Sequence, residues 1–406
     1  MAGVAGKARF YLERSVPQLR EWEEKELFSK DEIRTIVQKR NEHEHRVLSP
    51  GNLPSDWSAY AKWEQSLESL RRKRCKRLKI HHLNSAHAGQ ARVMSIYERS
   101  VNRHPGSSDL WRAYLSYAAS VKAAKRWRKT MTSALRMMPH DADLWIMAGR
   151  RSASHGDMAS ARGFFMRGCR FCNKDCRLWV EYAKVEMEWL VKVDKRKQTK
   201  AADPLRPDRA DDDDELRIVG SDDDDGDGDD DDDEDGHGGD SLPKPSKAQA
   251  EVIDKHASEQ LKSNPAMDGA IPMAIFDISQ KQAFYSPEVA ETFFLLFTSF
   301  KKSLSVEPRI SQHVLDALNE QYPNHPCTCS CYIRQPILGV SPRTADFPRG
   351  LREVMARLGD KLDSTTDKAE LGSKTAGWID DYLALGDLDD AIRQVLEHIK
   401  GKVALS

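Results

Sequence analysis

The chain has 406 residues and a formal net charge of −1, because 63 Lys and Arg residues nearly balance 64 Asp and Glu residues. This length allows two or three ordinary domains or one extended repeat array. The longest strongly apolar run, Phe293–Phe297, is far shorter than the about 20 residues of a membrane-spanning helix, and no apolar signal-peptide core is visible. We therefore expect neither a membrane span nor a secretory signal. The odd number of seven cysteines favours a reduced intracellular compartment.

The first 50 residues are predicted to be helical. Ile33, Ile36 and Val37 share an apolar face, and Ser29 with Glu32 fits a capping box at the start of that helix. A further helix is predicted to follow the turn residues Pro50, Gly51 and Pro54, with Ser55 or Asp56 as its N-cap.

A dense basic stretch follows this helix. It holds seven cations within nine residues: Arg71, Arg72, Lys73, Arg74, Lys76, Arg77 and Lys79. Cations at this density neutralise phosphates and release counterions, so the stretch is a candidate RNA contact or nuclear-import signal. The alternative is a solvated, highly charged extension of the helix.

The strongest pattern in the chain is a 34-residue period. Trp111, Trp145 and Trp179 recur at this interval, and Pro105 and Pro139 each precede a Trp by six residues. Bulky apolar residues recur before these punctuation points, and aromatic residues follow most of the tryptophans by three positions. The period is typical of helical hairpins that stack and bury a shared core. We expect that core to contain Trp57, Tyr60, Tyr97, Trp111, Tyr114, Trp145, Phe165, Trp179 and Tyr182.

The period ends at an acidic segment. Asp211–Asp240 contains 18 acidic residues and one Arg, so it carries a net charge of −17 and leaves +16 for the rest of the chain. A segment of this composition buries too little apolar surface to offset the conformational entropy lost on ordering, so we predict a disordered linker. Opposite charge blocks suggest nucleic acid or basic partners. We expect the cations to concentrate outside the periodic core.

Helical patterning returns after the acidic segment. Ser286 and Pro287 are predicted to start one helix, and Trp378 and Tyr382 precede a turn at Gly386 in a last helical hairpin. The predicted fold is therefore an all-α helical-hairpin solenoid with a disordered acidic linker. Its predicted parts are an N-terminal helical region (1–85), helical repeats (86–200), the linker (201–250) and a degenerate helical array (251–406).

Chemistry-bearing motifs are scarce. Cys169, Cys172 and Cys176 form one cluster and Cys327, Cys329 and Cys331 another, but neither has the paired spacing of a structural zinc site. No nucleophile elbow, phosphate-binding loop or dinucleotide fingerprint is found. We expect no catalytic residue, no cofactor, no metal and no small-molecule substrate.

The Trp-x-x-Tyr pairs together with Arg162, Phe165 and Arg167 resemble HAT (half-a-TPR) repeats. The N-terminal block is similar to the HAT-repeat subunit of the UTP-B subcomplex of the small-subunit processome, in the U-three snoRNA-associated protein family. The matching residues are Tyr11-Leu12-Glu13, Pro17, Leu27-Phe28, Ile33, Arg40 and Glu44-His45-Arg46, with a looser match at Ile271-Pro272 and Ala274–Asp277.

This resemblance implies a non-catalytic, nucleolar scaffold for small-subunit rRNA maturation. Its implied partners are WD40-propeller subunits of UTP-B, with the 5′ external transcribed spacer of pre-rRNA and the snoRNP contacted indirectly or electrostatically. Two alternatives stay open. One is a HAT scaffold of splicing or mRNA 3′-end processing. The other is an acidic chaperone of histones or ribosomal proteins, which would act through Asp211–Asp240.

Overall fold

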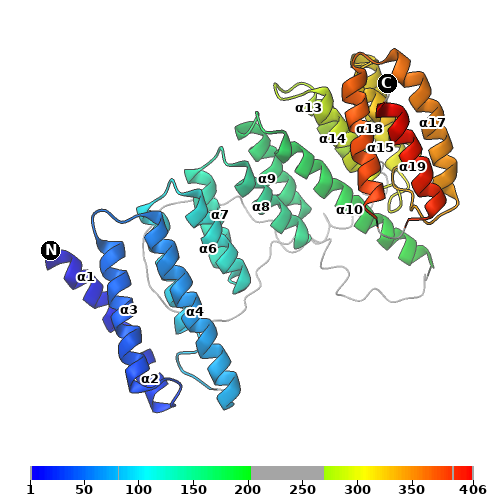
Figure 1. Cartoon of the computed structure of the whole chain (residues 1–406). Helices are drawn as coiled ribbons and strands as arrows, with labels where there is room; N and C mark the ends of the chain where they lie inside the picture. Colours follow the sequence, from blue (N-terminus) through cyan, green and yellow to red (C-terminus); the bar gives the residue numbers. More distant parts are fainter. Residues whose placement is uncertain (1, 81, 203–268, 386–387, 405–406) are drawn as a thin grey trace. The chain divides into compact units, whose positions relative to one another are not determined.

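The computed structural model describes residues 2–80, 82–202, 269–385 and 388–404 (Figure 1). Every regular element in these ranges is an α-helix, so the all-α prediction is confirmed. None of the described helices is both long and apolar enough to cross a membrane. The predicted acidic linker, residues 201–250, lies outside the described residues from position 203 onward.

The chain divides into two compact units, Met1–Leu144 and Trp145–Ser406. This division falls inside the segment predicted as helical repeats (86–200), within helix α8 (Ala142–Ser154), and not at the acidic segment. Each unit is described separately below. The domain boundaries expected from the sequence stay predictions.

The N-terminal unit consists of helices of which most neighbours in the chain pack on one another. Contacts join α1 to α3, α4 to α5, α5 to α6 and α6 to α7. The helices are α1 (Ala2–Glu13), α2 (Val16–Glu24), α3 (Lys30–Leu48), α4 (Pro54–Leu78), α5 (Ala88–Arg103), α6 (Ser108–Ser120) and α7 (Ala124–Met137).

Local sequence explains where these helices begin. The Ser29 side chain accepts the Glu32 N–H, and the Glu32 carboxylate accepts the Ser29 N–H, so the predicted capping box is confirmed at α3. The N-cap of α4 is Leu53, two or three residues before the predicted cap at Ser55 or Asp56. Pro54 occupies its first turn because the fixed φ of proline suits that position, and the Asp56 carboxylate accepts the N–H of Leu53.

The second unit continues the helical pairs and adds the C-terminal helices. It contains α8 from Trp145 onward, α9 (Met158–Phe171), α10 (Cys176–Ala202), α13 (Ala270–Ser279), α14 (Pro287–Thr298), α15 (Glu307–Gln321), α16 (Pro326–Arg334), α17 (Asp346–Ser364), α18 (Lys368–Leu383) and α19 (Asp390–Ala404). Helix α10 packs on both α13 and α14, and the rings of Trp179 and Phe284 lie 6.1 Å apart. The helices on either side of the acidic segment therefore share one core.

The 34-residue period is visible in the backbone hydrogen bonds. His104, Met138 and Cys172 stand 34 residues apart, and each N–H donates to the carbonyl four residues earlier at the end of its helix. The turns between α6 and α7 and between α8 and α9 are likewise closed by equivalent bonds, from Ala123 and Asp157. Equivalent sequence positions thus adopt equivalent local structure.

Aromatic packing follows the same period. All nine aromatic residues assigned to the repeat core are at most 7 % exposed. Tyr97 stacks on Tyr114 with ring centroids 5.7 Å apart, and two periods later Phe165 stacks on Tyr182 at 5.1 Å. Burying flat rings in this way supplies much of the apolar area that holds each helical pair together.

The C-terminal helices show the predicted helix start at Ser286 and the predicted packing of the last two helices. Ser286 caps α14 by accepting the Val289 N–H, and Pro287 lies in the first turn, as predicted. Helices α18 and α19 pack on each other, with Trp378 buried in their core. The predicted turn at Gly386 lies outside the described residues.

Candidate interaction surfaces

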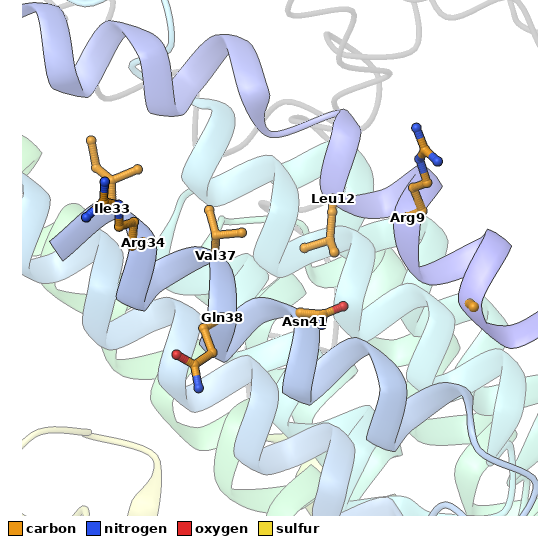
Figure 2. A pocket seen from close by; sticks show the side chains of 8 residues that line it. Arg9, Leu12, Ile33, Arg34, Val37, Gln38 and Asn41 are labelled. Carbon is orange, nitrogen blue, oxygen red and sulfur yellow. The ribbon is translucent and has the colours of Figure 1, made fainter. Parts of the chain in front are cut away.

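A groove runs between α1 and α3 in the N-terminal unit and is here called the α1–α3 groove (Figure 2). Its volume is about 640 Å³. Figure 2 shows Leu12 of α1 and Val37 of α3 facing the same gap. The lining residues are Ala5, Arg9, Leu12, Ile33, Arg34, Val37, Gln38 and Asn41.

The chemistry of this lining suits the binding of an apolar segment. Leu12, Ile33 and Val37 form an apolar strip, and Val37 remains 39 % exposed. The lining contains no thiol, hydroxyl, imidazole or carboxylate that could act as a nucleophile or general base. Arg9 and Arg34 border the strip and pair only with exposed carboxylates on their own helices, where such pairs are weak. The groove is therefore apolar in the middle and positive at its border.

A buried ionic network fixes α3, which forms one wall of the groove. The Arg40 guanidinium forms two bonds to the Glu64 carboxylate of α4, with Nε–Oε1 at 2.7 Å and Nη2–Oε2 at 3.0 Å. One turn later, Glu44 accepts two bonds of 2.9 Å from Arg99 of α5 and a third from the Tyr60 hydroxyl. Bidentate geometry of this kind fixes the relative orientation of the helices.

Burial makes this network sensitive to the loss of any member. The Arg40 and Glu64 side chains are 1 % and 2 % exposed, and a buried charge without its partner is strongly destabilising. Burial, together with the negative charges of Glu64 and Glu44, raises the pKa of Tyr60 well above its usual value. Tyr60 therefore stays protonated and donates its hydrogen to Glu44.

Sequence patterning did not reveal this network, although Arg40 and Glu44 were among the residues of the family resemblance. Ile36, Arg40, Glu44 and Val47 are all buried on α3, and their spacing of three or four places them on one face. The signal was present as charged residues on the buried face of an amphipathic helix. Their partners, 24 and 55 residues away, have no signature in the sequence.

The structure separates the seven cations of the basic stretch into two groups. Arg71 is buried, bonds to both oxygens of Glu68 and donates to the Ala86 carbonyl. Arg74 bonds to both oxygens of Glu32 and lies 4.4 Å from the centre of the Phe28 ring. These two arginines tie α4 to its neighbours, so they are not free to contact a phosphate.

The other five cations of the stretch are exposed: Arg72, Lys73, Lys76, Arg77 and Lys79. Of these, Arg72 also bonds to Glu68, at 3.0 Å. The exposed group extends along the last two turns of α4, and Lys79 ends the helix in a left-handed conformation. The cationic surface is therefore smaller than the sequence suggested.

The connection after the basic stretch is held by Glu21 of α2. Its carboxylate accepts the N–H groups of Asn84 and Ser85, at 2.6 and 2.9 Å, and pairs with Lys25. Burial opposes ionisation of Glu21, but the bonds from Ser85, Asn84 and Lys25 outweigh it and lower its pKa to about 2. The ionised carboxylate therefore stabilises the connection between α4 and α5.

Five of the six clustered cysteines are buried. Cys169 and Cys172 are buried near the end of α9, and Cys327, Cys329 and Cys331 are buried along α16. Among the described residues, potential ligand atoms of Glu288, Cys327 and Glu370 lie within 4.8 Å of one another. Burial raises the pKa of the Cys327 thiol to about 12, so this thiol is protonated at neutral pH.

Taken together, the described part of the chain is an all-helical protein with a polar-bordered apolar groove and a cationic helix end. Comparison with known proteins shows a similarity to one family over part of the chain. Residues 12–96 match the family model described as U3 small nucleolar RNA-associated protein 6. This segment includes most of the α1–α3 groove, the buried ionic network apart from Arg99, and the basic stretch.

Three relatives carry the same description. The Schizosaccharomyces pombe protein is 32 % identical over 198 residues, covering 48 % of this chain and 41 % of the relative. The Mus musculus and Homo sapiens homologs are 26 % and 25 % identical over 190 residues, covering 46 % of this chain and 32 % of each relative. The chain thus spans less than half the length of these relatives. The matches confirm the predicted resemblance to the U3 small nucleolar RNA-associated protein 6 family.

Proposed function

We propose that this protein is a non-catalytic scaffold subunit of the nucleolar small-subunit processome, within UTP-B, and supports pre-rRNA processing and small ribosomal subunit biogenesis. The observation that carries the proposal is the family match over residues 12–96, the segment that builds most of the groove and its supporting network. A splicing or 3′-end-processing scaffold would share the repeats but not this N-terminal match. The 34-residue recurrence of helix ends and stacked rings supports the assignment of HAT repeats.

The proposed activity is protein binding at the α1–α3 groove. Its occupant is a segment of a WD40-propeller subunit of UTP-B, with apolar side chains for Leu12, Ile33 and Val37 and carboxylates for the bordering Arg9 and Arg34. Apolar anchors that enter a pocket dominate the energy of such interfaces, and the charged border adds orientation and speed of association.

A matched pair of substitutions on α3 tests this binding. Val37→Asp introduces a carboxylate into the groove, whereas Thr35→Asp introduces one at an exposed position of the same helix that does not line the groove. Affinity purification after nuclease treatment should recover WD40 subunits with the wild type and with Thr35→Asp, and at least about tenfold less with Val37→Asp, the loss that 1.4 kcal/mol produces. Equal recovery with both variants would contradict the assignment of the groove.

Contact between the basic stretch and pre-rRNA or the snoRNP is proposed to be electrostatic. A sharp test changes only exposed cations, as in Lys73→Gln/Lys76→Gln/Arg77→Gln, and leaves the structural Arg71 and Arg74 intact. This variant should crosslink less to RNA or enter the nucleus less efficiently while keeping its protein partners. Loss of the protein partners together with RNA would show that the stretch is part of the protein interface.

A further inference from the structure

Helix α7 presents a second cationic surface, inside the repeat region. It carries Lys125, Arg126, Arg128, Lys129 and Arg136, all exposed, and it contains no acidic residue. Its buried residues are Trp127, Thr130, Met131, Ala134 and Leu135. The helix is thus divided into an apolar face and a positive face. The expectation that cations concentrate outside the periodic core does not hold for this helix.

The cations extend along most of the helix. From Lys125 through Lys129 to Arg136 the rise is about 16 Å at 1.5 Å per residue, and these three positions lie within roughly 40° of one another around the helix axis at 100° per residue. Thr132 and Ser133, also on the solvent side, each donate a hydroxyl bond to a backbone carbonyl of the helix. The positive face is therefore long, polar and without an exposed aromatic ring, since Trp127 is buried.

This positive face is not neutralised by neighbouring carboxylates. Within the described ranges, Lys125, Arg128, Lys129 and Arg136 take part in no ion pair. Arg126 differs from these four cations. It lies near the hydroxyl of Tyr114, and the negative charge of Glu98 acts on the same hydroxyl. By contrast, Arg112, Arg150 and Arg162 on other helices of the repeats each pair with a carboxylate.

The next repeat provides an internal comparison. Lys122, in the turn before α7, has φ of 61°, whereas Gly156, 34 residues later, has φ of 83° in the equivalent turn. Lysine is disfavoured in this left-handed conformation and glycine is not. Likewise, Lys125 corresponds to Ala159 and Lys129 to Gly163. The fold therefore does not require these three lysines, and one of them is held against a backbone preference.

The charge and geometry point to a ligand class: we infer that the positive face of α7 binds the phosphate backbone of RNA, without reading its sequence. Unpaired cations on a rigid helix neutralise phosphates and release counterions, whereas contacts that read sequence need groups that reach base edges or stack on bases. An acidic protein is a poorer fit, because protein interfaces depend on large apolar anchors and Met137, at the end of α7, is the one large apolar side chain of this helix that is exposed. This surface is distinct from the basic stretch and the α1–α3 groove, so the inference does not depend on the proposed protein docking.

The repeat comparison also supplies the test variant. Lys122→Gly/Lys125→Ala/Lys129→Ala removes three positive charges and relieves the left-handed lysine, so it should melt at or above the temperature of the wild type. The control variant, Lys62→Ala/Lys281→Ala/Lys302→Ala, removes three exposed lysines from other helices and loops. A third variant, Lys122→Arg/Lys125→Arg/Lys129→Arg, retains all the charges.

Binding of the full chain to a fluorescein-labelled 20-nucleotide uridine RNA is measured by anisotropy at several KCl concentrations. The variant Lys122→Gly/Lys125→Ala/Lys129→Ala should bind the RNA at least about tenfold more weakly at low salt. Each phosphate contact on a single strand contributes about 0.7 to the slope of log K against log salt, so the loss of three contacts should reduce this slope by about 2. The control and arginine variants should bind as the wild type does. The inference would be overturned if this variant bound the RNA with wild-type affinity, or if the control variant lost as much affinity. It would also be overturned if polyglutamate of matched charge competed for the protein as well as RNA does.

Discussion

Replacing Arg40 by Met should destabilise the N-terminal unit, because the Glu64 carboxylate would stay buried without its bidentate partner. The two bonds are 2.7 and 3.0 Å long, and neither side chain is more than 2 % exposed. Removing one member of a buried ion pair costs about 3–5 kcal/mol. The positive charge of Arg92 also interacts with the Glu64 carboxylate and would partly compensate its charge. We therefore expect a loss of stability at the lower end of this range, about 3 kcal/mol.

The double variant Arg40→Met/Glu64→Leu should be more stable than Arg40→Met alone, because it removes the unpaired charge along with the pair. Urea denaturation followed by tryptophan fluorescence gives the free energies of unfolding for this double-mutant cycle. Arg34→Met is the control, because Arg34 is exposed on the same helix and should change stability by less than about 0.5 kcal/mol. Additive losses in the double variant, or a single-variant loss below about 1 kcal/mol, would refute the reasoning.

Three further predictions concern other parts of the fold. The pKa of Glu21 lies at about 2, below its usual 4.5. The ionised carboxylate therefore stabilises the fold fully above about pH 5, and this stabilisation is lost as the pH falls towards 2. Glu21→Gln should make the melting temperature depend less on pH between these two values. Gly149→Ala should lower the melting temperature, because the new Cβ would lie 2.4 Å from the Phe165 ring, whereas Gly163→Ala, with no atom within 4 Å, should raise it slightly. Trp145→Ala should cost about 3–5 kcal/mol in denaturant unfolding, and an unchanged midpoint would contradict its role in the repeat core.

Much of the helical organisation could be predicted from local sequence. The capping box at Ser29, the cap at Ser286 and the 34-residue recurrence are short-range signals, and each fixes backbone hydrogen bonds within a few residues. The family resemblance was also available from residues near the N-terminus. These features required no knowledge of how distant segments meet.

The interaction surfaces could be predicted only in part. Arg71 and Arg74 belong to a dense basic stretch, and nothing in that pattern shows that Glu68 and Glu32 neutralise them. Glu32 is 42 residues from Arg74, so the pairing depends on how α3 packs against α4. The same holds for the groove, which exists because α1 contacts α3 and leaves Val37 partly uncovered.

The most direct test of the central proposal is affinity purification of the tagged 406-residue chain from nuclear extract, with and without nuclease, followed by identification of the bound proteins. The scaffold account predicts that WD40-propeller subunits of UTP-B remain bound after RNA is digested, and that Val37→Asp releases them while Thr35→Asp does not. Loss of every processome protein upon nuclease treatment of the wild-type sample would contradict the account.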